Sequence, residues 1–439
     1  MRRVLNASSY RNYMLTILMV ILAFNYVDRL ALAVVLQDIK AELSVSDTQL
    51  GLLSGIAFAL FYSLMGLPIA RWADRGNRVV IITVTTLLWS VAVVLCGMAT
   101  TFLQLLLIRV GVAVGEAGCI PPAHSLIADT FTREERPRAV ARYMQGGPLS
   151  VVLGYCLAGW LSQFYGWRAT FIVLGFPGLV LAALAWFTLT EPRSAKLKVD
   201  SDAEVAALSP ASATPTSLQV HPRLREVCAT LWANKSFRHL LFCVSIVYFF
   251  TQGIGQWQPA FFMRSYGIGP GELGTWFTVI WGLGGVVGTY LGGEWAWRYA
   301  SQNEQLQLKV MGVAYAVFGM ISVGVYLSPN RYVALGLLGL ASVGVNSTSG
   351  PLFATIQTLV PDRMRALSVA LIYLFANLIG MGLGPLAAGA LSDAFRPWAG
   401  DESLRYALLA LCPGYLWGTW HLWQSSRTVT RDLQNVPCN

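Results

Sequence analysis

The sequence has little charge and few residues that bind metals. Only 12% of its 439 residues are Asp, Glu, Lys or Arg, whereas a soluble domain carries about 25%. It has four histidines, and its seven cysteines are scattered without a Cys-x-x-Cys pair. This composition excludes a soluble globular domain and argues against a disulfide framework or a metal cluster. The sequence also lacks a phosphate-binding Walker loop, His-Glu-x-x-His and Gly-x-Ser-x-Gly, so no motif indicates a membrane enzyme. A non-transporting receptor is supported equally weakly.

Long apolar segments dominate what is present, because 55% of the residues are hydrophobic. Each of twelve such segments is long enough to cross the ~30 Å hydrocarbon core of a membrane as a helix. The sequence therefore predicts an all-α membrane protein with twelve transmembrane helices. The segments lie near residues 12–36, 48–71, 79–98, 102–129, 138–163, 168–189, 237–262, 271–297, 308–327, 331–358, 365–392 and 403–424.

The basic residues are distributed unevenly between the loops. With twelve spans, 23 of the 31 Lys and Arg fall in the loops on the side of the termini, and six fall in the loops on the other side. Loops rich in Lys and Arg remain in the cytoplasm, so both termini are predicted to be cytoplasmic, in a bacterial inner membrane. The net charge of +9 is thus a topology signal and does not indicate nucleic-acid binding.

One long polar linker divides the chain into two halves. We expect a six-helix bundle in residues 1–189, a cytoplasmic linker in 190–236, a second bundle in 237–425 and a cytoplasmic tail in 426–439. Within the linker, residues 201–217 are rich in Ser, Ala and Pro, which is typical of disorder. Residues 224–232 have helical periodicity and are expected to lie along the inner membrane surface.

The two halves resemble each other. Arg-Pro-Arg-Ala at 136–139 follows the fourth span, and Arg-Met-Arg-Ala at 363–366 follows the tenth. The fifth span has a Gly-x-x-Ser pattern at 159–162, and the eleventh has one at 389–392. Matches in corresponding places predict a duplicated unit and hence two pseudo-symmetric six-helix bundles.

Two full charges, Arg109 and Glu116, interrupt the fourth apolar span. A charge at bilayer depth costs about 2.5–3.5 kcal/mol on insertion scales, so it normally faces a cavity and is functional. Helical geometry places both residues on one face and places Gly111, Gly115 and Gly118 roughly opposite, where a neighbouring helix can approach closely. A buried ion pair that only joins helices is the alternative.

The first span carries a matching set of polar residues, because Asn25, Asp28 and Arg29 share one face. The rise per residue puts Asp28 at a depth similar to that of Arg109 and leaves Glu116 less firmly paired. An under-paired carboxylate in a low-dielectric cavity binds a proton more readily. We therefore predict Glu116, with Asp28, as the proton-coupling site, with Arg29, Arg109 and Asn25 completing the network. A structural salt bridge remains the alternative for the first-span charges.

The loop after the second span contains Asp74, Arg75, Gly76 and Arg78. These residues match the Gly-x-x-x-Asp-Arg-x-Gly-x-Arg motif of the major facilitator superfamily, except that Ala70 stands where Gly is usual. The resemblance covers nearly the whole chain outside the linker and tail. It implies two six-helix bundles around a central cavity that opens alternately to each side.

A narrower resemblance rests on Asn-Tyr-Val-Asp-Arg at 25–29 together with Gly-Glu-Ala at 115–117 and Ala-Asp-Thr-Phe at 128–131. This combination looks like the spinster-like branch, whose members are associated with sphingolipids and lysophospholipids. The anion:cation symporter branch has a similar first span. The resemblance implies functional charges at Asp28, Arg29 and Glu116.

The motif loops also predict a cytoplasmic gate. Asp74 is expected to accept hydrogen bonds from the helix that follows Arg363, a contact that exists only when the cytoplasmic side is closed. An ordinary solvated loop is the alternative. The remaining residues expected at this gate are Arg75, Arg78, Asp129, Arg136 and Arg298.

The predicted cavity residues of the second half are uncharged. They are Gln252, Gln256, Trp257, Asn346 and Asn377. His124 follows two prolines in the fourth span and is either a proton relay or a packed neutral side chain.

The sequence thus predicts a monomeric, proton-coupled secondary transporter of a small amphipathic or lipid-like substrate in the lipid bilayer. We expect no cofactor other than the proton as coupling ion, no bound metal and no enzymatic activity. The alternative is a symporter of a small organic anion held by Arg29 and Arg109.

Overall fold

The computed structural model of the chain describes residues 7–192, 224–300, 303–361 and 364–434. Within these residues every regular element is a helix. The first half of the chain contains α1 (Ala7–Leu43), α2 (Asp47–Ser54), α3 (Ile56–Arg75), α4 (Arg78–Cys96), α5 (Phe102–Glu116), α6 (Ile120–Thr130), α7 (Arg136–Met144), α8 (Gly146–Val151), the π-helical turn η1 (Val152–Leu157) and α9 (Ala158–Thr188).

The second half has the same kind of construction, with short π-helical or 3₁₀ turns inside the long helices. Its elements are α11 (Leu224–Ala233), α12 (Lys235–Tyr248), η2 (Phe249–Gly253), η3 (Ile254–Trp257), α13 (Gln258–Tyr266), α14 (Pro270–Phe277), η4 (Thr278–Leu283), α15 (Gly284–Ala300), α16 (Glu304–Leu327), α17 (Arg331–Thr358), α18 (Arg365–Phe375), η6 (Ala376–Leu383), α19 (Gly384–Ala399), η7 (Gly400–Glu402), α20 (Ser403–Leu411) and α21 (Gly414–Gln434).

Nine stretches of the described chain are long and apolar enough to cross a membrane. Two of them are 53 and 68 residues long, at 136–188 and 367–434. A straight helix of 53 residues would measure about 80 Å, so each of these stretches must cross twice. In the first, the turn is at Gly166, whose φ of 79° is unfavourable for residues with a side chain. The helices from α14 to α15 supply the remaining crossing, which confirms an integral membrane protein with twelve spans.

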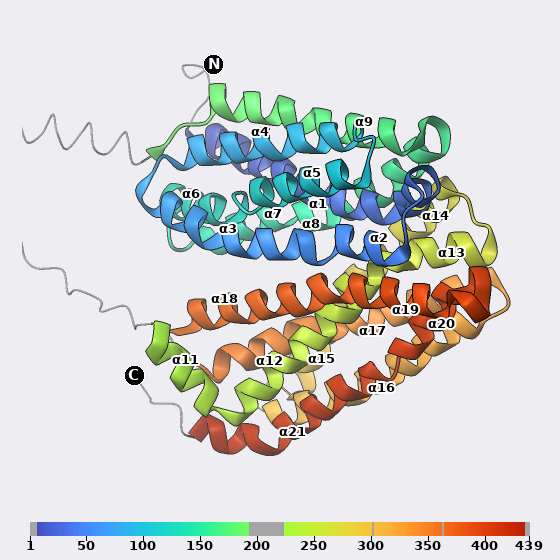
Figure 1. The fold of residues 1–439 in the computed structure, drawn as a ribbon. Helices are drawn as coiled ribbons and strands as arrows, with labels where there is room; N and C mark the ends of the chain where they lie inside the picture. The colour runs from blue at the N-terminus through green and yellow to red at the C-terminus, as the bar shows by residue number, and fades with distance from the viewer. Residues whose placement is uncertain (1–6, 193–223, 301–302, 362–363, 435–439) are drawn as a thin grey trace, which may run out of the picture.

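The two halves lie side by side, with the N-terminal and C-terminal ends of the chain at the same end of the molecule (Figure 1). The most extensive contacts between the halves are those of α2 with α19 and of α9 with α14, at the opposite end, here called the far end. These contacts are backbone to backbone: a Cβ on Gly51 would lie 2.4 Å from the carbonyl oxygen of Pro385, and a Cβ on Gly159 would lie 2.4 Å from that of Pro270. The far end is therefore closed.

The ends of the predicted segments differ in detail from the observed helices. Residues 224–233 do form a helix, α11, as their periodicity predicted. The last helix, α21, continues to Gln434, past residue 425 where the second bundle was expected to end. Residues 201–217, for which disorder was predicted, lie outside the described residues.

Candidate functional site

The site begins at a break in the fourth span, which the sequence predicted as one segment from 102 to 129. Helix α5 ends at Glu116, and α6 starts only at Ile120. Pro121 and Pro122 cause the break, because neither has the N–H that a continuous helix needs and their rings clash with the preceding turn. The break places Glu116 at the end of a helix, where its carbonyl oxygen accepts a bond from the N–H of Cys119 (3.1 Å).

The glycine face of α5 packs against α4, as predicted. A Cβ on Gly115 would lie 2.7 Å from the backbone nitrogen of Trp89, and a Cβ on Gly118 would lie 2.3 Å from Cγ2 of Thr85. Only glycine permits such a close approach. This packing fixes the rotation of α5 and turns its charged face away from α4, toward α1.

The predicted contact between the first and fourth spans is present. The Nη1 atom of Arg109 donates a short hydrogen bond to Oδ2 of Asp28. The two side chains are only 1% and 2% exposed. Since both charges are removed from solvent, each depends on the other for its stabilisation.

Glu116 is not the weakly paired carboxylate that was expected. Arg29 donates to its Oε2 from Nε (2.8 Å) and from Nη2 (2.5 Å), and the Glu116 side chain is fully buried. The prediction was wrong because it assigned Arg29 no partner of its own. Successive helical residues are rotated by about 100°, so Asp28 and Arg29 each reach a different charge of α5.

Aromatic rings surround the guanidinium of Arg29, a feature that we did not predict. Its Cζ lies 5.0 Å from the ring centre of Tyr26, 4.5 Å from that of Phe58 and 4.7 Å from that of Tyr62. These distances are typical of cation–π interactions. The Nη1 atom also contacts Sδ of Met381 in η6 at 4.0 Å, so Arg29 connects the charge network to the second half.

Several acceptor oxygens of the network have no donor within the described part of the chain. They are Oδ1 of Asp28, Oε1 of Glu116 and Oδ1 of Asn25, and all three are buried. The Asp28 and Glu116 carboxyl groups also interact electrostatically with each other. Asn25 is fully buried, and its amide contacts the Glu116 carbonyl oxygen at 3.4 Å. Buried polar atoms normally have partners, so the two carboxyl groups of this cluster are positions where a proton could be bound.

The motif arginine Arg78 is fully buried, and among the described residues its ion-pair partners are Glu191 and Asp129, both near the first bundle. It forms ion pairs with Glu191, which follows α9, and with Oδ2 of Asp129 (2.7 Å), and it donates to the carbonyl oxygen of Ser125 (2.8 Å). Sequence reasoning missed Glu191, although a single acid directly after the sixth span is a recognisable signal. Arg78 thus ties the loop motif to the end of the sixth span.

The other predicted gate residues form local contacts or lie outside the described residues. Arg136 donates to the carbonyl oxygen of Ala128 (2.8 Å), and Arg298 pairs with Glu294 one turn away (2.6 Å). Arg75 is exposed. Arg363 and the side chain of Asp74 lie outside the described residues, so the latch between them stays a prediction.

The predicted residues of the second half are not alike. Trp257 is fully buried and donates from its indole nitrogen to the carbonyl oxygen of Pro385 (2.9 Å), so it packs the core and does not line a cavity. Asn346 donates to the carbonyl oxygen of its own helix at Ser342 (2.8 Å). The remaining three are at least partly accessible: Gln252, Gln256 and Asn377. His124 is half-buried and packs edge-on against Tyr143, with ring centres 5.4 Å apart.

A second charged cluster, at the far end, was not predicted. Asp47 begins α2 and is only 1% exposed. It accepts hydrogen bonds from Nη1 and Nη2 of Arg264 (2.7 and 2.6 Å), from Lys40 (2.7 Å) and from Ser392 (2.7 Å). Because Arg264 and Ser392 belong to the second half, this carboxylate joins the two halves.

Asp393 strengthens the same contact. Its carboxylate accepts the backbone N–H groups of Asp47 (3.1 Å) and Thr48 (2.8 Å), so a side chain of α19 caps the N-terminus of α2. The sequence does show the local capping box formed by Ser46 and Gln49. It could not show the partner from the other half, because that requires the relative position of two helices more than 340 residues apart in the chain.

Comparison with known proteins agrees with this architecture. The family model described as Major Facilitator Superfamily matches residues 18–385. The chain therefore belongs to the major facilitator superfamily, and it is a transporter rather than an enzyme. The resemblance to the spinster-like branch is also confirmed by a solved structure, a bacterial homologue of the human lysosomal transporter spinster in an inward-facing, unoccupied conformation. That structure is 30% identical, with a TM-score of 0.82, and the match covers 96% of this chain and 98% of the other.

Two other relatives carry different transporter descriptions. An MFS-type efflux pump of Mycolicibacterium smegmatis is 30% identical over 93% of this chain and 91% of its own length. A probable L-galactonate transporter of Escherichia coli K12 is 24% identical over 88% of this chain and 82% of its own length. Family membership therefore establishes a membrane transporter of small molecules without identifying the substrate.

Proposed function

We propose that the protein is a proton-coupled secondary transporter of a small amphipathic, lipid-like substrate of the sphingoid or lysolipid type. The observation that carries this proposal is the buried network Arg109–Asp28 and Glu116–Arg29, in which each of the two carboxyl groups keeps one unpartnered oxygen. A single proton shared by these groups would give each free oxygen a hydrogen-bond partner and remove their mutual repulsion. The pair, rather than Glu116 alone, is then the proton carrier.

The charge balance of the network couples the proton to the substrate. Two arginines and two carboxylates sum to zero, whereas the same network with one proton carries a charge of +1. A buried positive charge favours an anionic group nearby. Proton and anionic substrate therefore favour each other's binding, and the coupling is reciprocal because it is a free energy shared by two sites.

Through Arg29, a change in the charge network can alter the contact between the two halves of the molecule. It is 13% exposed, and it contacts both Glu116 of the first half and Met381 of the second. Protonation of Glu116 weakens its hold on the guanidinium and lets Arg29 turn toward a substrate anion. The contact with the second half changes at the same time, which links occupancy to alternating access.

Aromatic side chains support the amphipathic nature of the substrate. In the second half, Tyr373 is 39% exposed and its ring centre lies 6.1 Å from that of Tyr248 and 5.4 Å from that of Phe353. Such an aromatic surface in the second half, together with the basic Arg29 of the first half, suits a molecule with one charged end and one apolar end. The alternative, a symporter of a small organic anion, is supported by the two network arginines and by the galactonate relative.

We further propose a bacterial inner membrane location with both termini in the cytoplasm, on the basis of the positive-inside distribution of Lys and Arg. The closed far end is then periplasmic, so this conformation is closed toward the periplasm. The protein acts as a monomer, since one chain contains both bundles.

Reconstitution into proteoliposomes tests the function. A panel of a phosphorylated sphingoid base, a lysophospholipid and a sugar acid is offered under an imposed pH gradient, and accumulation of the two lipid-like substrates, which carry an anionic phosphate, is expected. Accumulation of only the sugar acid would favour the alternative. Uptake of a lipid-like substrate that ignores the pH gradient would exclude proton coupling.

The variant Glu116→Gln tests proton coupling separately from substrate transport. Gln resembles the protonated side chain, so the variant should lose pH-driven uptake and keep exchange of substrate across the membrane without a gradient. Unchanged proton dependence in this variant would contradict the role of Glu116. Gly111→Ala, on the opposite face of α5, is the matched control, because its Cβ would meet only the Cβ of Ala92 at 3.8 Å.

A further inference from the structure

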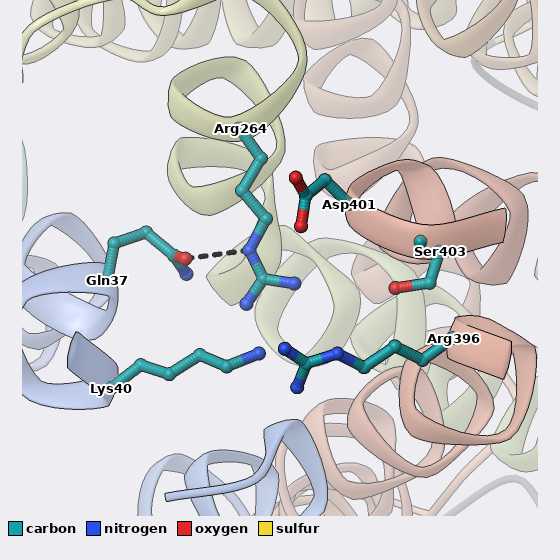
Figure 2. Close-up of a pocket in the computed structure, with 7 residues that line it drawn as sticks. Gln37, Lys40, Arg264, Arg396, Asp401 and Ser403 are labelled. Carbon is teal, nitrogen blue, oxygen red and sulfur yellow. Dashed lines mark hydrogen bonds between the residues drawn. The ribbon is translucent and has the colours of Figure 1, made fainter. Parts of the chain in front are cut away.

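The far end contains a cavity between the two halves (Figure 2). Its volume is about 320 Å³. The side-chain ends of Lys40, Arg264 and Arg396 point toward one another across it, with Asp401 and Ser403 on one side. Lys40 comes from α1 in the first half, and the two arginines come from α13 and α19 in the second.

Most of the charged side chains that line this cavity are positive. Lys40 and Arg264 share one carboxylate, that of Asp47. Arg396 is exposed and forms no ion pair with any residue that the structure describes. Among the residues that line the cavity, the three cations face one carboxylate, that of Asp401. The carboxylates of Asp47 and Asp393 lie beside the cavity, where Asp47 is bonded to Lys40 and Arg264 and Asp393 is bonded to the start of α2. Three of the six Lys and Arg that the topology places outside the cytoplasm thus converge on this one place.

A neutral donor adds to the three cations. The Oε1 atom of Gln37 accepts a hydrogen bond from Nε of Arg264 (2.6 Å), which fixes the orientation of the amide. Its Nε2 atom is then a donor, and it is buried without a partner within the described residues. A buried N–H without a partner costs free energy, and a bound acceptor oxygen would recover it. The lining therefore offers donors and positive charge to an oxyanion.

We propose that this cavity binds a phosphate or carboxylate group and that the bound anion stabilises the closed far end. The reason is geometric: Lys40 belongs to one half and Arg264 and Arg396 to the other, so one anion bonded to all three holds the halves together. The inference does not depend on the proposed substrate or on proton coupling. The anionic group could come from a free anion in solution or from the headgroup of an anionic lipid, since both present the same oxygens.

The test measures thermal unfolding of the purified full chain by tryptophan fluorescence. The protein is placed in nanodiscs of phosphatidylcholine and titrated with inorganic phosphate against potassium chloride at constant ionic strength. A second set of nanodiscs contains phosphatidylglycerol and no added phosphate. A rise in the unfolding temperature with phosphate indicates a free anion as the ligand, and a rise only with phosphatidylglycerol indicates a lipid headgroup.

Arg396→Gln is the decisive variant, because Arg396 is exposed and takes part in no ion pair needed for folding. Loss of one charge-assisted contact should raise the apparent Kd for the anion by about tenfold or more. Arg331→Gln, at the start of α17 at the same end, is the matched control and should leave the Kd unchanged. Arg396→Lys retains the charge and should keep part of the shift.

Two results would overturn the proposal. One is the absence of any rise in unfolding temperature in both the phosphate and the phosphatidylglycerol arms. The other is a rise that Arg396→Gln and Arg331→Gln show to the same extent as the wild-type chain, because this would mean that the anion acts on the protein surface in general.

Discussion

The buried pair Arg109–Asp28 allows the functional role of the network to be separated from a structural one. Arg109→Gln leaves Asp28 as an isolated carboxylate that is only 2% exposed. Removing one partner of a buried ion pair destabilises a protein by about 3–5 kcal/mol. For a half of roughly 190 residues, 3 kcal/mol corresponds to a fall of about 6–12 °C in unfolding temperature. The double variant Asp28→Asn with Arg109→Gln leaves no unpaired charge and should recover most of this loss.

Transport by the same variants distinguishes a functional role of the Arg109–Asp28 pair from a structural one. If the pair only joins α1 to α5, the double variant should transport as well as it folds. The proposed role in coupling requires the charges themselves, so the double variant should fold with a near-normal unfolding temperature and still lose pH-driven uptake. Thermal unfolding and proteoliposome uptake are measured on the same preparations. Uptake close to that of the wild-type chain in the stable double variant would refute the reasoning.

Three further predictions concern packing and the two ends of the molecule. Gly115→Ala should destabilise the protein by about 1–3 kcal/mol in thermal unfolding, because its Cβ would lie 2.7 Å from the backbone of Trp89. Gly111→Ala should leave the stability unchanged, and equal effects of the two substitutions would contradict the packing of α5 on α4. Asp74→Asn should lower the uptake rate without changing the unfolding temperature, and normal uptake kinetics would exclude the latch. Asp47→Asn removes the carboxylate shared by Lys40 and Arg264 and should therefore favour opening of the far end. A Cys introduced at the buried position 403 should then react faster with a membrane-impermeant maleimide added from the far end. An unchanged reaction rate would show that this carboxylate does not hold the far end closed.

The parts of the fold that the sequence predicts are those set by local pattern. Apolar length gives the spans, and the glycine spacing on α5 gives its packing face. The rise per residue brings Asp28 to the depth of Arg109. The same arithmetic failed for Glu116, because depth alone does not say which way a side chain points. Arg29 lies one residue beyond Asp28, and the rotation of α1 against α5, which decides its partner, is set by packing with other helices.

Other features of the site needed the tertiary structure in different ways. The break after Glu116 was readable in principle, because two consecutive prolines cannot continue a helix. Trp257 looked like a cavity residue from its position near two glutamines, and only the approach of α19 shows that its indole is buried. The far-end cluster could not be predicted from a local sequence pattern, because the ion-pair partner of Asp47 is Arg264 in the other half.

The placement of the ion pairs indicates where the conformational change meets resistance. The pairs Arg109–Asp28, Arg29–Glu116 and Arg78–Glu191 each lie within the first half, so a rigid rotation of one half against the other leaves them intact. The pair Arg264–Asp47 joins the halves and must break when the far end opens. Opening therefore exchanges a buried carboxylate's hydrogen bonds for water, whereas closing restores them. The proposed protonation of the central network would change its charge without breaking a contact between halves, except at Arg29, where the guanidinium touches Met381. The ion pair that must break and the proposed proton site are thus different groups of residues, and Arg29 is the residue through which one could influence the other.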